Sequence, residues 1–299
     1  MNDLLLGAIE GGGTKFICAV GYSAERILER IVIPTESPAP TLKAALNFFS
    51  DAQRQHGPIG ALGIASFGPL DLRRGSPSFG RLMRTPKANW SGVDMVGTFR
   101  SRFDVPIAID TDVAAAALAE ADLGAGRDVG SVAYVTVGTG IGAGFAPGVL
   151  NGARLLHPEV GHLRVQRHGG DGDFKGLCPF HGDCLEGLAS GPALVARWGR
   201  ELEKIDPSHP AWAIEAHYLG QLAASIALIA SPERIILGGG VMSNGPLLSH
   251  VQRAAGAFLN GYIEPLNDAA ALERYICSPG LGDRAGLAGA FLLAGQATT

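Results

Sequence analysis

Apolar residues in this chain fall into short runs separated by glycine-rich turns. Residues Leu4–Val20 contain an apolar run, the turn Gly-Gly-Gly-Thr and a second apolar run, and Ser131–Phe145 repeat this arrangement. The order of run, turn and run is typical of two strands joined as a hairpin. Because the pattern occurs once in each half of the chain, it predicts two α/β units that each begin with a hairpin.

Longer segments with helical periodicity follow each hairpin. They predict helices over Thr41–Gln55, Val93–Arg102, Ala211–Ala230 and Leu247–Asn260. Short apolar runs between them predict buried strands over Ile59–Ser66, Ile107–Asp110 and Arg234–Leu237. Strands and helices mixed in this way indicate an α/β fold.

The repeat also suggests how the chain divides. Gly124-Ala-Gly126 lies just before the second hairpin, so we expect an N-terminal lobe over 1–124 and a C-terminal lobe over 125–285. The last segment, 286–299, is predicted to form a helix that returns to the N-terminal lobe. At 299 residues the chain is long enough for two hydrophobic cores.

Composition argues against several classes of function. The formal net charge is −4 and no Lys/Arg-rich run occurs, which disfavours a nucleic-acid partner because phosphate neutralisation needs a basic surface. No apolar run approaches the length of a membrane span, and residues 1–4 have no signal-peptide pattern. The four cysteines, at 18, 178, 184 and 277, are too sparse for a disulfide framework. We therefore expect a cytoplasmic protein.

Two glycine–threonine turns carry the chemistry of phosphate binding. Glu10–Lys15 and Val137–Gly144 each offer unhindered backbone N–H groups and a threonine hydroxyl, and the first adds the Lys15 cation. Neither a Walker A motif nor G-x-G-x-x-G occurs in the sequence. One such cluster could be only a tight hairpin, but two in matching places favour a triphosphate site. A third cluster, Ile235–Met242, follows a strand, where flat backbone could pack against an adenine ring.

Two carboxylates follow the predicted strand that begins at Ile107. Asp110 and Asp112 lie where open α/β sheets bind ligands, at the carboxyl end of a strand. One of them could accept a proton from a substrate hydroxyl. The alternative is that either caps the helix that begins near Val113. We interpret Asp110 as structural and Asp112 as catalytic.

Four metal-binding side chains are spaced through a glycine-rich loop. His162, Cys178, His181 and Cys184 offer two imidazoles and two thiolates, which satisfy tetrahedral Zn²⁺. Four protein ligands leave no open position, so the predicted zinc is structural. The alternative is a disulfide between Cys178 and Cys184, which a cytoplasmic setting disfavours.

Two further carboxylates flank this loop. Glu159 lies three residues before His162, and Glu186 lies two residues after Cys184. Together they form a polar group that could bind sugar hydroxyls. Three other polar residues of the loop, His168, Asp171 and Asp173, are expected to be solvated.

These motifs resemble the ROK family of sugar kinases and repressors in order and spacing along nearly the whole chain. The segments that carry the resemblance are Glu10–Lys15, Asp110–Val113, Glu159–His162, Cys178–Glu186 and Ile236–Gly240. Cys-Pro-Phe-His-Gly-Asp-Cys-Leu-Glu is specific and resembles the bacterial fructokinase branch. Ser66–Leu70 and Thr85-Pro-Lys87 with Trp90 also resemble that branch.

The resemblance implies an actin-like (ribonuclease H-like) ATPase fold of two duplicated α/β lobes with a cleft between them. It implies a homodimer that uses ATP with Mg²⁺ to phosphorylate a primary hydroxyl of a hexose, with fructose favoured. Asp112 would be the base, and Glu159, His162 and Glu186 would bind the sugar, with His162 shared with the zinc. The ATP-binding positions would be Gly11, Gly12, Gly13, Thr14, Lys15, Gly138, Thr139, Gly140, Pro192, Gly238, Gly239, Gly240, Val241 and Met242.

One position departs from the family pattern. The family usually has Asn two residues after the base, and this chain has Ala114. Two alternatives to fructokinase stay open: a kinase for mannose or glucose, and a non-catalytic sugar-sensing protein of the same family. Family repressors carry an N-terminal DNA-binding region, whereas this sequence enters its first strand at Leu4.

Overall fold

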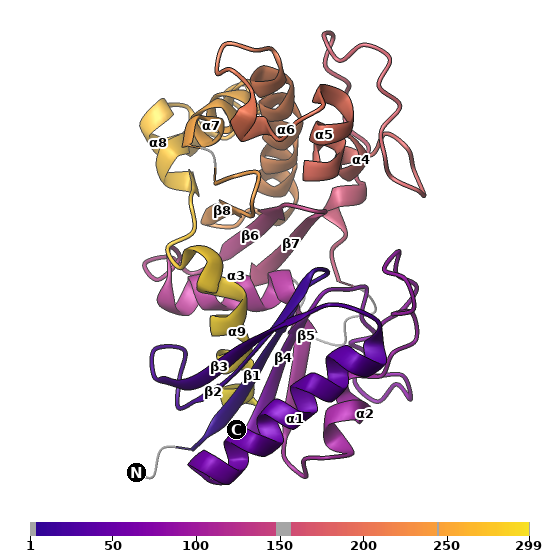
Figure 1. Ribbon diagram of the computed structural model, residues 1–299. Coiled ribbons are helices and arrows are strands. Elements are labelled where there is room, and N and C mark those ends of the chain that lie inside the picture. Colours follow the sequence, from indigo (N-terminus) through magenta and orange to yellow (C-terminus); the bar gives the residue numbers. More distant parts are fainter. Residues whose placement is uncertain (1–3, 148–156, 244, 299) are drawn as a thin grey trace. The chain divides into compact units, whose positions relative to one another are not determined.

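The computed structural model describes residues 4–147, 157–243 and 245–298, and the chain forms two compact units (Figure 1). Unit 1 consists of the described parts of Met1–Ala119, Leu150–His157 and Asp283–Thr299. Unit 2 consists of the described parts of Glu120–Val149 and Pro158–Gly282. Each unit contains one β-sheet with its own helices, which confirms the mixed α/β class.

Unit 1 is built on a five-stranded sheet in the order β3-β2-β1-β4-β5. The strands are β1 (Leu6–Gly11), β2 (Lys15–Gly21), β3 (Ile27–Pro34), β4 (Ala61–Ser66) and β5 (Ile107–Thr111). The predicted hairpin is the antiparallel pair β1–β2, and β4 and β5 continue the sheet in parallel. The carboxyl ends of the three parallel strands therefore lie at one edge of the sheet, where glycines and acids follow them.

Helices cover both faces of this sheet, as the alternation of side chains along a strand requires. Phe16, Cys18 and Val20 pack in one core with α1 (Pro38–His56) and α2 (Met95–Arg100). The intervening Ile17 and Ala19 pack on the opposite face with α9 (Ala285–Gln296). The helix α3 (Asp112–Leu123) follows β5 directly.

Unit 2 contains a four-stranded sheet in the order β7-β6-β8-β9. Its strands are β6 (Val132–Val137), β7 (Ile141–Ala146), β8 (Arg234–Gly238) and β9 (Ile276–Cys277). Its α-helices are α4 (Leu185–Ala189), α5 (Gly191–Trp198), α6 (Ala211–Ala230), α7 (Gly245–Leu259) and α8 (Ala269–Tyr275). As in unit 1, the first two strands form an antiparallel hairpin and the next strand joins in parallel.

Single-turn 3-10 helices complete the described secondary structure. They span Val160–His162, Leu202–Lys204, Glu264–Leu266 and Gly282–Arg284. The predicted helices and strands are all present with small shifts at their ends, and Ala211–Ala230 is matched at both ends. Five elements were not predicted: the strands β3 and β9 and the helices α4, α5 and α8. The strand β3 is of mixed polarity, and the other four are short.

The helix α6 forms the centre of unit 2. Among the described residues it is the one helix long and apolar enough to cross a membrane, but 61% of that apolar window is buried inside the protein. It packs along α7, and a Cβ at Gly220 would lie 2.6 Å from the Ala254 Cβ. Its length and hydrophobicity therefore fit a core helix.

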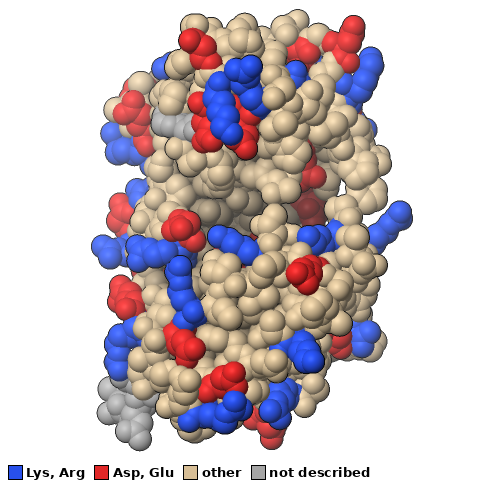
Figure 2. Space-filling model, in the orientation of Figure 1, with Lys and Arg blue, Asp and Glu red and all other residues tan. Residues whose placement is uncertain are grey.

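Charged side chains are mixed on the face of the molecule seen in Figure 2. Lys and Arg lie among Asp and Glu on this face. This distribution agrees with the small net charge of −4.

Candidate active site

The turn between β1 and β2 is held by hydrogen bonds to its carbonyl groups. Gly12 N donates to Lys15 O at 2.9 Å, and the Thr35 hydroxyl donates to Gly12 O at 2.8 Å. The Lys87 ammonium donates to Gly13 O at 2.6 Å. A Cβ at Gly13 would have no heavy atom within 4 Å, so its backbone is open to a ligand. These hydrogen bonds fix the carbonyl groups of the turn and so hold its backbone in one conformation.

Lys87 is a functional candidate to which the sequence pattern assigned no role. It entered the sequence analysis only as part of the family segment Thr85-Pro-Lys87. Its contacts with Gly13 O and, at 3.4 Å, with Thr35 O fix the turn to the loop that carries Lys87. The Lys87 ammonium also brings a positive charge close to the turn, which favours an anionic ligand there.

Glu10, the next-to-last residue of β1, is a second candidate that the sequence analysis left without a role. Its Oε2 is buried and has no hydrogen-bond partner among the described residues. Burial raises its pKa from 4.5 to about 7, the negative charge of Asp112 adds to this shift, and Lys15 opposes it. A Cβ at Gly286 would lie 2.6 Å from the Glu10 carboxyl, so the start of α9 closes over it. Unit 1 therefore holds two interacting carboxyl groups.

Asp112 is the first residue of α3 and is half-buried. Desolvation raises its pKa, although its Oδ1 accepts a hydrogen bond from Val113 N at 2.9 Å. The Thr111 hydroxyl accepts from Ala114 N at 3.2 Å and so occupies the capping position. Asp110 Oδ1 accepts from Thr111 N at 2.8 Å. Because Thr111 caps the helix, the carboxylate of Asp112 is not needed for that purpose.

The second glycine–threonine turn joins β6 to β7 in unit 2. Gly138 N donates to Gly140 O at 2.9 Å, and Gly138 O accepts from Gly191 N at 2.8 Å. The second bond ties the turn to the start of α5, where Pro192 is exposed. Thr139 is exposed at the tip. The turn thus presents Thr139 and open backbone beside the N-terminus of a helix, an arrangement that suits phosphate oxygens.

Glu186 lies in α4 and contacts the same turn. Its Oε2 accepts a hydrogen bond from Ile141 N at 2.9 Å. A Cβ at Gly140 would lie 2.6 Å from that oxygen, so only glycine allows this approach. One carboxylate oxygen is therefore occupied by the turn, and Glu186 connects the turn to the loop that carries Cys178, His181 and Cys184.

The segment after β8, Gly239–Met242, is only partly accessible to a ligand. Gly239 has φ +92°, and a Cβ there would lie 2.6 Å from Val137 N. Gly240 is exposed and has free space where a Cβ would be. The Val241 and Met242 side chains, by contrast, are each 8% exposed and belong to the core of unit 2. Of the predicted adenine-binding residues, Gly238, Val241 and Met242 are buried, Gly239 is half-buried, and Gly240 is exposed.

His162, Cys178, His181 and Cys184 come together in unit 2, with all four ligand atoms within 4.8 Å of one another. Cys178 Sγ lies 3.7 Å from His162 Nδ1 and 3.6 Å from His181 Nδ1, and Cys184 Sγ lies 3.6 Å from His162 Nδ1. Tetrahedral Zn²⁺ with ordinary bond lengths places S and N ligands about 3.6 Å apart. The four side chains therefore fit such an ion.

The thiols of this cluster are free. Burial, and to a lesser extent the neighbouring Cys178 sulfur, raises the pKa of Cys184 to about 11. A bound divalent metal reverses such a shift because it stabilises the thiolate. His162 turns Nδ1 toward the sulfurs, which leaves its Nε2 for another partner. Glu159 is exposed next to it and accepts a backbone hydrogen bond from His162 N through its carbonyl at 3.0 Å.

One expectation about the loop was wrong. Asp171 is 6% exposed rather than solvated. Its carboxylate pairs with Arg167 at 2.8 Å and Arg197 at 3.1 Å and accepts a hydrogen bond from the Tyr218 hydroxyl. This buried cluster anchors the loop to α5 and α6, a role that needs partners from distant segments and leaves no local signal.

The chain is similar to known sugar kinases along nearly its whole length. The ROK family model matches residues 6–297. The chain is 44% identical to a fructokinase of Zymomonas mobilis subsp. mobilis, over 97% of this chain and 96% of that protein. It is 41% identical to a fructokinase of Pediococcus pentosaceus, over 97% of this chain and 98% of that protein.

A solved structure extends the comparison to the fold. A ROK family glucokinase from Streptomyces griseus, in complex with glucose and AMPPNP, matches with a TM-score of 0.76 and 25% identity, over 98% of this chain and 99% of that one. The fold is therefore that of actin-like sugar kinases. The chain belongs to the ROK family.

Proposed function

We propose that this chain is an ATP-dependent fructokinase, which transfers the γ-phosphoryl group of ATP to the 6-hydroxyl of D-fructose and releases fructose 6-phosphate and ADP. The observation that carries the proposal is the identity of 41–44% with two fructokinases over nearly the whole chain. The glycine–threonine turn in each unit supports ATP as the donor, because both turns offer open backbone and an exposed threonine.

Asp112 is our candidate for the general base. Its carboxylate would accept the proton of the sugar hydroxyl as the hydroxyl oxygen bonds to the γ-phosphorus and the bond from that phosphorus to the β–γ bridging oxygen breaks. Desolvation, which raises the pKa of Asp112, strengthens it as a base. The cap at Thr111 supports this assignment, since Asp112 is then free for chemistry.

ATP would be bound by both glycine–threonine turns. Unit 1 would contribute Gly11, Gly12, Gly13, Thr14 and Lys15, and unit 2 would contribute Gly138, Thr139, Gly140, Pro192 and the segment Gly238–Met242. Magnesium enters as part of the substrate MgATP and neutralises charge on the phosphates. Glu10 is half-buried beside Asp112, and we add it to the polar residues of unit 1 that face this chemistry.

The sugar would be bound by Glu159, His162 and Glu186. His162 turns Nδ1 toward Cys178, which leaves Nε2 for the sugar. Glu186 uses Oε2 to accept from Ile141 N, which leaves Oε1 for the sugar. These two available atoms support the choice. A structural Zn²⁺ held by His162, Cys178, His181 and Cys184 would order the loop that carries these groups. The metal would supply rigidity and no step of the reaction, because the four side chains complete a tetrahedral sphere.

We further propose a cytoplasmic homodimer without nucleic-acid or membrane partners. Free thiols at all four cysteines support a reducing compartment. For function we divide the chain into lobes at 1–124 and 125–285, with the helix in 286–299 assigned to the first. Packing of α9 against β1 and β4 supports that last assignment.

Release of ADP with a panel of hexoses tests the proposal. Fructose should give the highest kcat/KM, and the product with fructose should be fructose 6-phosphate by NMR. A higher kcat/KM with mannose or glucose would replace fructose by that sugar within the same reaction. Absence of sugar-dependent ADP release with every hexose, in protein that is folded and binds ATP, would overturn the kinase assignment.

A further inference from the structure

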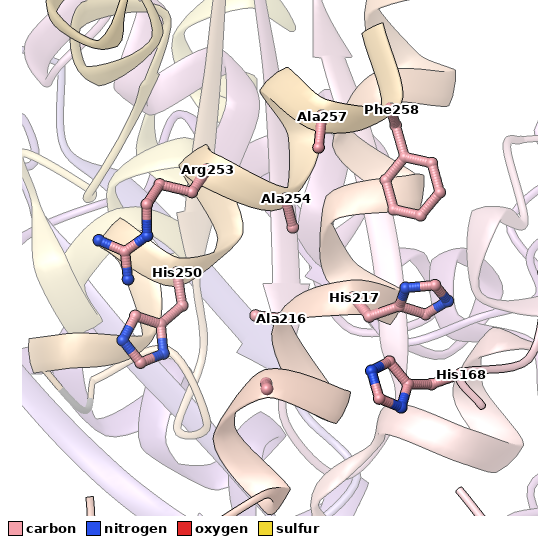
Figure 3. Close-up of a pocket in the computed structure, with 9 residues that line it drawn as sticks. His168, Ala216, His217, His250, Arg253, Ala254, Ala257 and Phe258 are labelled. Atoms are coloured by element: carbon pink, nitrogen blue, oxygen red, sulfur yellow. The ribbon is translucent and has the colours of Figure 1, made fainter. Parts of the chain in front are cut away.

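A separate cavity lies in unit 2 between α6 and α7 (Figure 3). Its volume is about 450 Å³, within the range of small-molecule sites. It is lined by His168, Ala213, Ala216, His217, His250, Arg253, Ala254, Ala257 and Phe258. None of these residues belongs to the proposed catalytic, sugar-binding, ATP-binding or zinc-binding sets.

Helical spacing explains why these side chains share one cavity. Ala213, Ala216 and His217 are three and four residues apart on α6, so they lie on one face. His250, Arg253 and Ala254 have the same spacing on α7. Alanines at the facing positions leave the space that larger core residues would fill.

The cavity has two chemically different ends. In Figure 3, His250 and Arg253 lie side by side at one end, and His168, His217 and Phe258 lie together at the other. The Ala216 and Ala254 side chains lie between the two groups. A ligand that fills the cavity would therefore meet the Arg253 guanidinium and the His250 imidazole at one end and aromatic rings at the other.

The first end is suited to an anion. None of the nine lining residues is Asp or Glu. Within the described part of the chain Arg253, which is exposed, forms no ion pair. Burial, with a contribution from the Arg253 charge, lowers the pKa of His250, so the two groups repel when both are charged. A bound anion would remove this repulsion and accept hydrogen bonds from both side chains.

The second end is an aromatic wall. The ring centroids of His168 and His217 are 5.0 Å apart, and those of His217 and Phe258 are 5.2 Å apart. His217 Nε2 lies 2.8 Å from the Gln166 carbonyl oxygen, which fixes that ring. His168 Nδ1 accepts from Gly170 N at 3.0 Å, so in the neutral ring Nε2 carries the proton and can donate. Such a wall fits the face of a ring that also carries hydrogen-bond acceptors.

We propose that this cavity binds a small phosphorylated ring compound, a sugar phosphate or a nucleotide, with its phosphate at His250 and Arg253 and its ring against His217 and Phe258. A phosphate has enough oxygens to accept from guanidinium and imidazole together. The site is independent of the proposed kinase reaction, because it shares no residue with it.

Histidine-selective NMR tests the proposal on the whole chain without added ADP, because ADP could itself occupy the cavity. The His217 and His250 signals report on the cavity and not on the proposed active site. The probes are glucose 6-phosphate, AMP and inorganic phosphate. The imidazole signals of His250 and His217 are assigned from the variants His250→Gln and His217→Gln, in each of which one signal disappears. We expect both signals to shift and saturate with glucose 6-phosphate or AMP, and the probe that binds more tightly identifies the ring. Inorganic phosphate should move the His250 signal alone.

Arg253→Gln should weaken binding of the preferred probe at least tenfold. Arg274→Gln, which changes another exposed arginine, this one on α8, is the control and should leave binding unchanged. Equal weakening in both variants would mean nonspecific charge attraction and would overturn the site. Absence of any shift at millimolar probe would also overturn it. So would changes in the two signals on dilution of the protein without probe, which would make this face an interface between copies of the chain.

Discussion

The three residues at the end of β5 and the start of α3, Asp110, Thr111 and Asp112, have different roles. Thr111 caps α3, and Asp110 accepts a hydrogen bond from the backbone of Thr111. Asp112 is left as a half-buried carboxyl whose pKa is raised by desolvation. The two acids, which look equivalent in the sequence, therefore differ in what their removal should do.

Asp112→Asn should lower kcat by about 10²–10⁴-fold, the usual effect of losing a general base. Folding and ADP affinity should change little, since Thr111 keeps the cap. Steady-state kinetics, a thermal melt and an ADP titration on one preparation measure all three. Asp110→Asn is the control and should retain most of kcat. A wild-type kcat in Asp112→Asn would mean that Asp112 is not the general base and has only a structural role at the start of α3.

Glu10 gives a prediction about pH and stability. Its pKa is 4.5 in the unfolded chain and about 7 in the folded protein, mainly through burial. The folded state therefore keeps a proton that the unfolded state has lost, so the contribution of Glu10 to stability is complete below pH 4.5 and is lost as pH rises through 7. The loss amounts to about 3 kcal/mol at most.

Glu10→Gln should remove this part of the pH dependence. The variant should be more stable than the parent protein at pH 8 in the absence of nucleotide, and the two should converge near pH 4.5. Urea unfolding at several pH values measures the difference. An equal offset at every pH would mean that the Glu10 carboxyl keeps its ordinary pKa in the folded protein.

Ala114 stands where the family usually has Asn. If that amide contacts sugar, Ala114→Asn should lower KM for fructose by up to about tenfold at similar kcat, since one neutral hydrogen bond contributes roughly 0.5–1.5 kcal/mol. If Ala114 only supports α3, the variant should lose about 0.5 kcal/mol of stability through helix propensity and keep its kinetics. Kinetics and a thermal melt on the same protein separate the two outcomes.

At the scale of elements, close packing of α9 on the sheet of unit 1 depends on glycine. A Cβ at Gly63 in β4 would overlap the Ala290 carbonyl and lie 2.6 Å from Ala294 N. Both neighbours are backbone atoms of α9, which cannot move away without shifting the helix.

Gly63→Ala should therefore destabilise the protein by about 1–3 kcal/mol or more. Gly295→Ala is the matched control in α9, because a Cβ there meets nothing within 4 Å. That variant should gain up to about 1 kcal/mol from helix propensity. Urea unfolding measures both. A neutral Gly63→Ala would show that α9 is not packed tightly on β4.

Across the whole molecule, the zinc loop should affect one substrate more than the other. We expect about one zinc per chain by elemental analysis, as four ligands to one ion require. Chelation should reduce fructose affinity, because His162 would be a ligand of the zinc and Glu186, in α4, follows the Cys184 ligand by two residues. Loss of one hydrogen bond to a charged group costs about 1.5–3 kcal/mol, roughly 10–150-fold in affinity. ATP affinity should fall much less.

Cys178→Ser should reproduce the effect of chelation, and Cys277→Ser is the control because Cys277 lies outside the cluster. Protein without zinc and with a Cys178–Cys184 disulfide in a peptide map would contradict the metal site. Equal losses of fructose and ATP affinity would mean that the loop supports the fold generally.

Much of the architecture was predictable because its signals are local. The hairpins at β1–β2 and β6–β7 follow from apolar runs on either side of a glycine turn. The helix α6 follows from one long segment that is mostly apolar. The four candidate metal ligands are recognisable by residue type and spacing, and the fold brings them together, namely His162, Cys178, His181 and Cys184. The short helices α4 and α5 were missed because packing on the core, more than intrinsic propensity, holds them.

The sequence by itself determined which residue types stand at the turns, the strand ends and the loop, since these depend on neighbours along the chain. Only the tertiary structure decided how those residues behave. Lys87 reaches a carbonyl 74 positions away, and Glu186 accepts from an amide 45 positions away. The pKa of Glu10 depends on burial and on Asp112, and Asp171 is buried by Arg197 and Tyr218. Burial and electrostatics depend on distance in space, which sequence spacing does not encode.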